Sequence, residues 1–63
     1  MINFINFNIN DEYYLLRLDY INAINYNKEV GKIFINYKDD EFISIHDVEL
    51  EEYENLVKLI GQF

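Results

Sequence analysis

The side chains in this sequence that could do chemistry are mainly carboxylates. Eight of the twelve form two runs, a short one in a polar stretch and a longer one where the last amphipathic stretch begins: Asp39, Asp40 and Glu41, then Asp47, Glu49, Glu51, Glu52 and Glu54. Carboxylate oxygens suit hard cations such as Ca²⁺, but neither run has the alternation and central glycine of a calcium-binding loop. The sequence therefore predicts no metal site and no cofactor.

Nucleophilic catalysis has little support. The chain contains no Cys and no Thr, and Ser44 is its one serine. Ser44 lies two residues before His46, the one histidine, so the two side chains would share a face of a strand. A catalytic pair of this kind needs an orienting carboxylate and an oxyanion-binding loop, and the sequence indicates neither. We predict no catalytic residues and a protein that is not an enzyme.

The carboxylates give the chain a strong negative charge, because twelve acids face five bases for a net charge of -7. Part of this has a structural explanation. Glu51 and Glu52 would lie at the positive end of a helix dipole, and Glu52 could close a capping box with Glu49 or Asp47 as the cap. The remaining surplus would repel nucleic acid and anionic membranes, which bind through Lys and Arg. We expect neither as a direct partner.

A basic protein surface is the natural complement of these acids. We hypothesise that both runs imitate the phosphates of a nucleic acid and occupy the basic surface of a nucleic-acid-binding host defence protein. In this hypothesis Tyr37 and Tyr53 are the contact aromatics, because buried aromatic side chains commonly anchor interfaces. The alternative is that the acidic face only keeps the protein in solution.

These residues must be positioned by strands followed by one helix. Alternating apolar residues predict strands over residues 5–9, 13–18, 32–38 and 42–46, and an irregular strand with a bulge over 20–26. The polar segments Asn10-Asp11, 25–32 and 38–41 predict turns, and Asp19 predicts a bend. The expected fold is α+β: an antiparallel meander of four or five strands, open or curled toward a barrel, before a C-terminal amphipathic helix.

The helix is predicted from a change of period. Apolar residues recur at steps of three and four, and Gly61 suits the C-terminal cap. The stripe consists of Leu50, Tyr53, Leu56, Val57, Ile60 and Phe63.

The 63 residues predict one domain, residues 1–63, with more apolar surface than one helix can cover. Tyr13 and Leu15 make the second strand apolar on both faces, so we expect that strand to be covered on both sides. Either a second copy in a homodimer or higher oligomer, or curling of the sheet, would supply the cover. The lack of Cys, of a signal-peptide pattern and of a membrane-spanning stretch predicts a cytoplasmic protein.

Two resemblances accompany these patterns. The first rests on the order of strands and helix and on Tyr14, Ile21, Ile24, Gly31, Ile33, Ile35 and the segment 50–60. In these features the chain resembles small bacterial proteins of the flagellar FlbD type, which implies a homo-oligomeric structural or adaptor module. In size, acidity, use of Asn and Tyr and lack of a site motif, the chain is similar to phage anti-defence proteins such as anti-CRISPR inhibitors. This second resemblance implies an inhibitor of a host protein.

Overall fold

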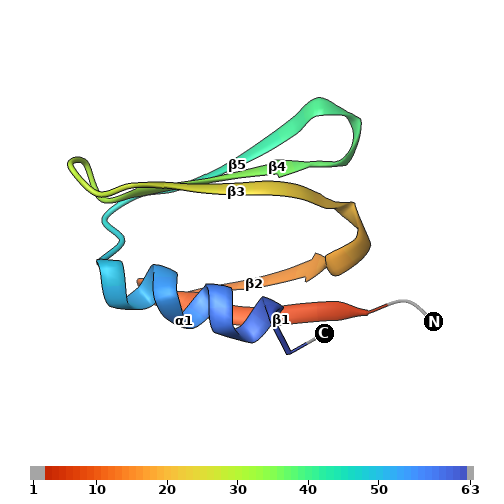
Figure 1. Ribbon diagram of the computed structural model, residues 1–63, viewed down its shortest axis with the longest axis horizontal. Helices are drawn as coiled ribbons and strands as arrows, with labels where there is room; N and C mark the ends of the chain where they lie inside the picture. The colour runs from red at the N-terminus through yellow and green to blue at the C-terminus, as the bar shows by residue number, and fades with distance from the viewer. Residues whose placement is uncertain (1–2, 63) are drawn as a thin grey trace.

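The computed structural model describes residues 3–62 and has an α+β fold, as the sequence predicts. It contains five antiparallel strands, two short 3₁₀ turns and one C-terminal helix (Figure 1). The strands are β1 (Phe4–Ile9), β2 (Glu12–Arg17), β3 (Ile21–Asn27), β4 (Lys32–Tyr37) and β5 (Glu41–Ile45). The 3₁₀ turns η1 and η2 span Leu18–Tyr20 and Lys38–Asp40, and the helix α1 spans Leu50–Ile60.

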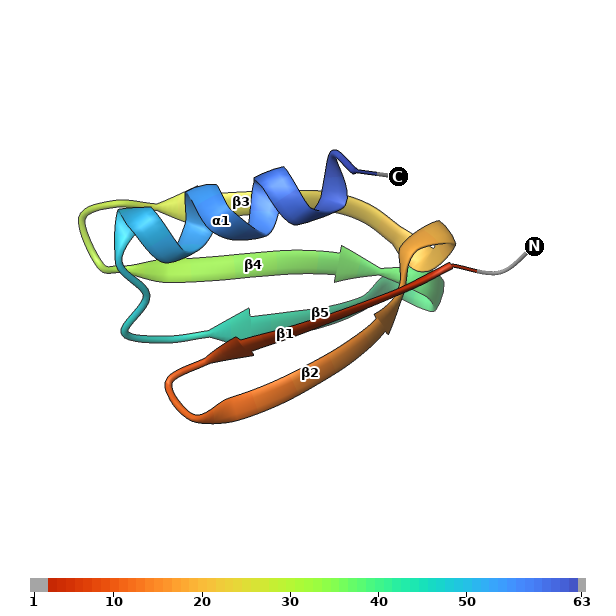
Figure 2. The same cartoon turned by 90° about the horizontal axis from the view of Figure 1, so that it is seen from below.

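The strands form two sheets rather than one meander. β1 pairs with β2, and β3, β4 and β5 form a three-stranded sheet in that order. The hairpin β1–β2 and α1 make one layer, and the three-stranded sheet makes the other (Figures 1 and 2). η1 carries the chain from one layer to the other, so β2 does not pair with β3 within residues 3–62. The sheets therefore do not close into the barrel that was one of the expected forms.

Local sequence explains the tight turns. Asn10 and Asp11 have φ of 54° and 64°, which Asn and Asp tolerate better than other residues with a side chain. Positive φ at both central residues is typical of a two-residue hairpin turn, and Ile9 is accordingly opposite Glu12. The predicted irregularity in the third strand is confirmed as a register shift between Ile21 and Ala23.

The core lies between the two layers. Its buried residues come from the inward-facing positions of four strands, from the β5–α1 connection and from α1: Ile5, Ile9, Leu16, Ile33, Ile35, Ile45, Val48 and Leu56. β4 is the central strand of its sheet, which explains why Ile33 and Ile35 have no exposed surface.

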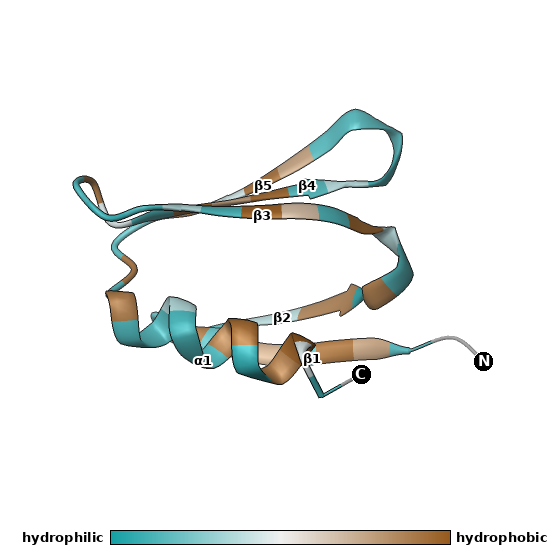
Figure 3. Cartoon of the chain, viewed as in Figure 1, coloured by the Kyte–Doolittle hydropathy of each residue, from teal (hydrophilic) through white to brown (hydrophobic). Residues whose placement is uncertain are grey.

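The predicted helix is confirmed, with Glu49 as its N-terminal cap and Gly61 as its C-terminal cap. Hydrophobic and hydrophilic residues alternate along it (Figure 3). Leu56 is buried, whereas Leu50 and Val57 are exposed, so the apolar stripe in contact with the core is narrower than the sequence suggests. Phe63, the last residue of the predicted stripe, lies outside the described residues.

The two layers bury only their inner faces. Tyr13 is 79% exposed and Leu15 is 67% exposed, because both point away from the three-stranded sheet. The expectation that this strand is covered on both sides is therefore wrong for the single chain. The outer face of the hairpin carries exposed apolar side chains, Phe4, Tyr13 and Leu15, that nothing within residues 3–62 covers.

Candidate functional site

The longer run of acids surrounds the start of α1, and we call it the helix-start cluster (Asp47, Glu49, Glu51, Glu52 and Glu54). The connection that carries it is held on both sides. Within this connection Val48 is buried, its N–H donates to the carbonyl of Gly31 at 2.8 Å, and its carbonyl accepts from the Tyr26 hydroxyl at 2.8 Å. Asn10 Nδ2 donates to the carbonyls of His46 and Asp47 at 2.9 and 3.0 Å. The cluster therefore lies on a fixed backbone.

Two members of the helix-start cluster, Glu49 and Glu52, have a structural task at the start of α1. The carboxylate of Glu52 accepts a hydrogen bond from the Glu49 N–H at 2.9 Å, which is the reach-back half of a capping box. The prediction of Glu52 as the N3 residue of such a box is confirmed, with Glu49 as the cap. Asp47, Glu51 and Glu54 are exposed, and their side chains make no hydrogen bond or ion pair within residues 3–62.

The shorter run of acids, which we call the turn cluster (Asp39, Asp40 and Glu41), spans the end of η2 and the first residue of β5. Asp39 and Asp40 have φ of 63° and 60°, so both occupy the left-handed region within a three-residue turn. All three side chains are exposed. β5 separates them from the helix-start cluster, and the two clusters lie toward opposite ends of the long dimension of the molecule (Figure 1). The structure does not bring the two runs together as one surface.

The two tyrosines expected to contact a partner are engaged inside the fold. The Tyr37 hydroxyl accepts from the Arg17 N–H at 2.9 Å, and its ring packs edge-on against Tyr20 at 5.6 Å between centroids. Tyr53 stacks on Tyr26 at 4.9 Å with the rings 11° from parallel. Both rings are half-buried, so they join the two layers and leave only part of their surface for a partner.

Few acids are neutralised by a base. The single ion pair among residues 3–62 joins Arg17 to Asp19, with 2.7 Å between Nη2 and Oδ2. Hydrogen bonding by the Arg17 guanidinium lowers the pKa of the Asp19 carboxyl, and the same bond raises the pKa of Arg17. Arg17 and Lys38 also lie over the ring of Tyr20, at 3.9 and 4.3 Å from its centroid, in cation–π contacts. Two of the five bases are thus held at one aromatic ring.

Ser44 and His46 line a polar pocket with Glu12 and Tyr14. The Tyr14 hydroxyl donates to the Glu12 carboxylate at 3.0 Å, so that carboxylate is directed to the tyrosine. Desolvation by burial, with the neighbouring Glu12 adding to it, raises the pKa of Tyr14. Neither Ser44 nor His46 makes a side-chain hydrogen bond within the described part of the chain, where no three His, Asp or Glu side chains are grouped as metal ligands.

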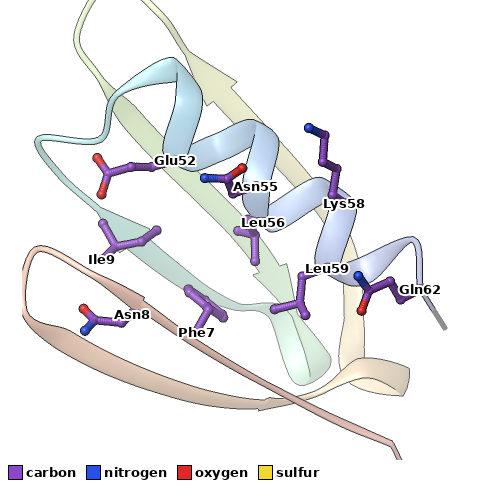
Figure 4. A pocket seen from close by; sticks show the side chains of 9 residues that line it. All are labelled: Phe7, Asn8, Ile9, Glu52, Asn55, Leu56, Lys58, Leu59 and Gln62. Carbon is purple, nitrogen blue, oxygen red and sulfur yellow. The ribbon is translucent and has the colours of Figure 1, made fainter.

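The sequence did not reveal a groove between β1 and α1 (Figure 4). Apolar residues of both elements form its floor, and polar residues of α1 form its rim. The floor includes Phe7, Ile9, Leu56 and Leu59, and the rim includes Glu52, Asn55 and Lys58. Only the packing of α1 beside β1 creates this groove, so a strand pattern and a helix pattern read separately could not have predicted it.

Comparison of the chain with models of known protein families, with curated proteins and with solved structures finds no match. Among residues 3–62 no helix is long and apolar enough to cross a membrane.

Proposed function

We propose that this chain is a small acidic binding protein whose helix-start cluster occupies a basic surface of another protein. In its specific form, the proposal is a phage-encoded cytoplasmic inhibitor that blocks the nucleic-acid-binding surface of a host defence protein. The resemblance in composition to anti-CRISPR inhibitors supports the specific form. The placement of the carboxylates supports the general form.

The observation that carries the proposal is a group of acids that the fold does not use. Asp47, Glu51 and Glu54 are exposed and have no basic partner within residues 3–62. The helix dipole accounts for acids in the first turn only, because its effect falls off within that turn. Glu54 is the fifth residue of α1 and lies beyond this first turn. Like charges concentrated on one rigid end favour the approach of a basic surface and raise the rate of association.

The separation of the two acidic clusters limits the shape of the partner. A partner that contacts only one cluster needs a basic patch of the size of one helix end. A partner that contacts both needs a basic groove along the long dimension of the molecule, which measures 36 Å. The helix-start cluster is the primary contact in our proposal because it holds more acids on a more firmly anchored backbone.

A second candidate function is supported by a different observation. The exposed apolar side chains of Tyr13 and Leu15 favour a homo-oligomeric structural or adaptor module, in which the acids only keep the assembly in solution. Native mass measurement of the purified protein separates the two candidates in part. A stable oligomer with no affinity for any basic partner would favour the module.

Charge reversal tests the proposed contact. The partner is captured from a lysate of the host bacterium and purified, and its association with the Glu51→Lys/Glu54→Lys variant is then measured. We expect a much slower association rate and weaker binding, because steering by the cluster is lost. Glu52 is left intact because it caps α1.

The matched control is Glu12→Lys/Glu29→Lys, which changes the net charge by the same amount at two exposed positions outside both acidic clusters. This control should bind nearly as well as the unmodified chain. If both double variants lose binding equally, net charge and not the helix-start cluster governs the interaction. Unchanged binding by Glu51→Lys/Glu54→Lys would contradict the proposal.

A further inference from the structure

β2 has a free edge. Its one strand neighbour among residues 3–62 is β1, and Figure 2 shows β2 at the outer margin of the hairpin. In a hairpin with a two-residue turn, the residues flanking the turn form a hydrogen-bonded pair, and such pairs then recur at every second residue. Ile9 and Glu12 flank this turn, so the even-numbered residues of β2 bond to β1. The N–H and C=O groups of its odd-numbered residues point to the free edge.

Two hydrogen bonds confirm this alternation. The N–H of Leu18, an even-numbered position, donates to the carbonyl of Asn3 at 2.9 Å beside β1. The N–H of Arg17, an odd-numbered position, donates to the Tyr37 hydroxyl at 2.9 Å on the other side. The free edge is therefore blocked at Arg17 and open at Tyr13 and Leu15.

The side chains at this open edge are apolar and exposed. Tyr13 and Leu15 lie on the outer face of the hairpin together with Phe4, which is also exposed. The remaining β1 positions on this face are Asn6 and Asn8, so no carboxylate lies among them. On a chain of net charge -7, the outer face of the hairpin strands is a surface without carboxylates.

We propose that β2 pairs antiparallel with β2 of a second copy of this chain across a twofold axis. The hairpins of the two copies would then form one four-stranded sheet in the order β1-β2-β2-β1. Edge strands that stay unpaired usually carry inward-pointing charges, a proline or a bulge, and β2 has none of these at Tyr13 to Leu15.

The geometry of β2 favours one register. A twofold axis perpendicular to the sheet keeps inner faces together, so opposed residues must both be odd or both even. Tyr13 then faces Leu15 of the second copy, and the reverse pair forms as well. These two pairs use the open N–H and C=O groups of both residues and make four backbone hydrogen bonds. A register in which Leu15 faces Leu15 of the second copy would pair Arg17 with Tyr13 and would need the N–H of Arg17. That N–H already donates to the Tyr37 hydroxyl.

The same register is complementary in shape. It places the two Tyr14 residues opposite each other on the axis. Tyr13 against Leu15 is an aromatic–aliphatic cross-strand pair, a favourable combination on a sheet. This self-complementarity identifies a second copy, rather than an unrelated strand, as the occupant of the edge.

The pairing is expected to be weak and reversible. The pairing would bury only one edge and part of one face of the six-residue β2. We therefore expect an interface smaller than the roughly 800 Å² per partner of a standard interface. Association should therefore depend on protein concentration, and it is best measured at moderate salt, where repulsion between two negatively charged chains is screened.

The first test is sedimentation equilibrium of the full chain over a concentration series. We expect the average mass to rise from one chain toward two. Leu15→Lys should abolish the rise because it places like charges at the centre of the new sheet. Phe42→Lys is the matched control, since Phe42 is 66% exposed on the other sheet, and it should dimerise normally. Far-UV circular dichroism checks that both variants are folded.

The second test fixes the register. The chain has no cysteine, so Tyr14→Cys introduces a single thiol. Non-hydrogen-bonded antiparallel pairs have Cα atoms about 4.5 Å apart, which is within the range that a disulfide spans. Mild oxidation should give a covalent dimer with Tyr14→Cys and none with Phe42→Cys.

Three results would overturn the proposal. They are a monomer at every concentration, a dimer that survives Leu15→Lys, and a dimer that is lost in Phe42→Lys. Equal cross-linking of both cysteine variants would also reject the register. None of these results depends on the helix-start cluster, so the proposal can fail while the proposed function stands.

Discussion

Gly31 lies in the turn between β3 and β4, and its carbonyl accepts a hydrogen bond from the N–H of Val48 just before α1. Its replacement should destabilise the whole domain. Its φ is +63°, and a Cβ built on it would lie 3.0 Å from the carbonyl oxygen of Val48. The left-handed conformation costs a residue with a side chain about 1–2 kcal/mol. Relief of the contact must move Val48, whose N–H donates to Gly31 and whose carbonyl accepts from Tyr26.

We therefore expect Gly31→Ala to lower the free energy of unfolding by about 2 kcal/mol, with crowding at Val48 added to the conformational cost. In a domain of this size, that loss corresponds to a decrease of about 8–16 °C in the melting temperature. Thermal unfolding followed by circular dichroism measures it.

Gly61→Ala is the matched control. Gly61 has a helical φ of -66°, and a Cβ there would lie 3.4 Å from its nearest neighbour, the Val57 carbonyl. The melting temperature of Gly61→Ala should stay close to that of the unmodified chain. Equal stability of Gly31→Ala and the unmodified chain would refute the reasoning, and so would an equal loss in both variants.

Two further predictions concern the capping and the ion pair. Glu52→Ala should lower the free energy of unfolding by about 1 kcal/mol because the Glu49 N–H loses its acceptor, whereas Glu52→Gln should keep most of the stability. Urea unfolding compares the two variants. An equal loss of stability in both would contradict the capping role of Glu52. Bonding to Arg17 lowers the pKa of Asp19, so this pair stabilises the fold above the pKa of an unfolded aspartate and loses its effect as pH falls through the folded value. Asp19→Asn should therefore show a shallower loss of stability under acidic conditions in melts over a pH series, and an unchanged pH profile would contradict this prediction.

Much of the fold could be predicted from the sequence because its signals are local. Asn10-Asp11 specifies a hairpin turn by its tolerance of positive φ, and the change from period two to steps of three and four marks the start of α1. The division into two layers could not be predicted. It depends on how the chain turns at η1, which long-range contacts such as the bond from Leu18 to Asn3 hold in place.

The candidate site was predictable to a similar extent. Glu52 was correctly placed in a capping box because that motif lies within four residues. The packing of Tyr37 and Tyr53 could not be predicted, because their partners Tyr20 and Tyr26 are distant along the chain. The separation of the two acidic clusters follows from the length of β5, since five residues of strand extend about 17 Å.

Competition between this chain and nucleic acid for one captured partner tests the central proposal most directly. The partner, loaded with labelled nucleic acid, is titrated with the chain while release of the label and binding of the chain are both followed. We predict that the chain displaces the nucleic acid, that excess nucleic acid displaces the chain, and that Glu51→Lys/Glu54→Lys does neither at the same concentration. Simultaneous binding of the chain and the nucleic acid to the partner would contradict the proposal.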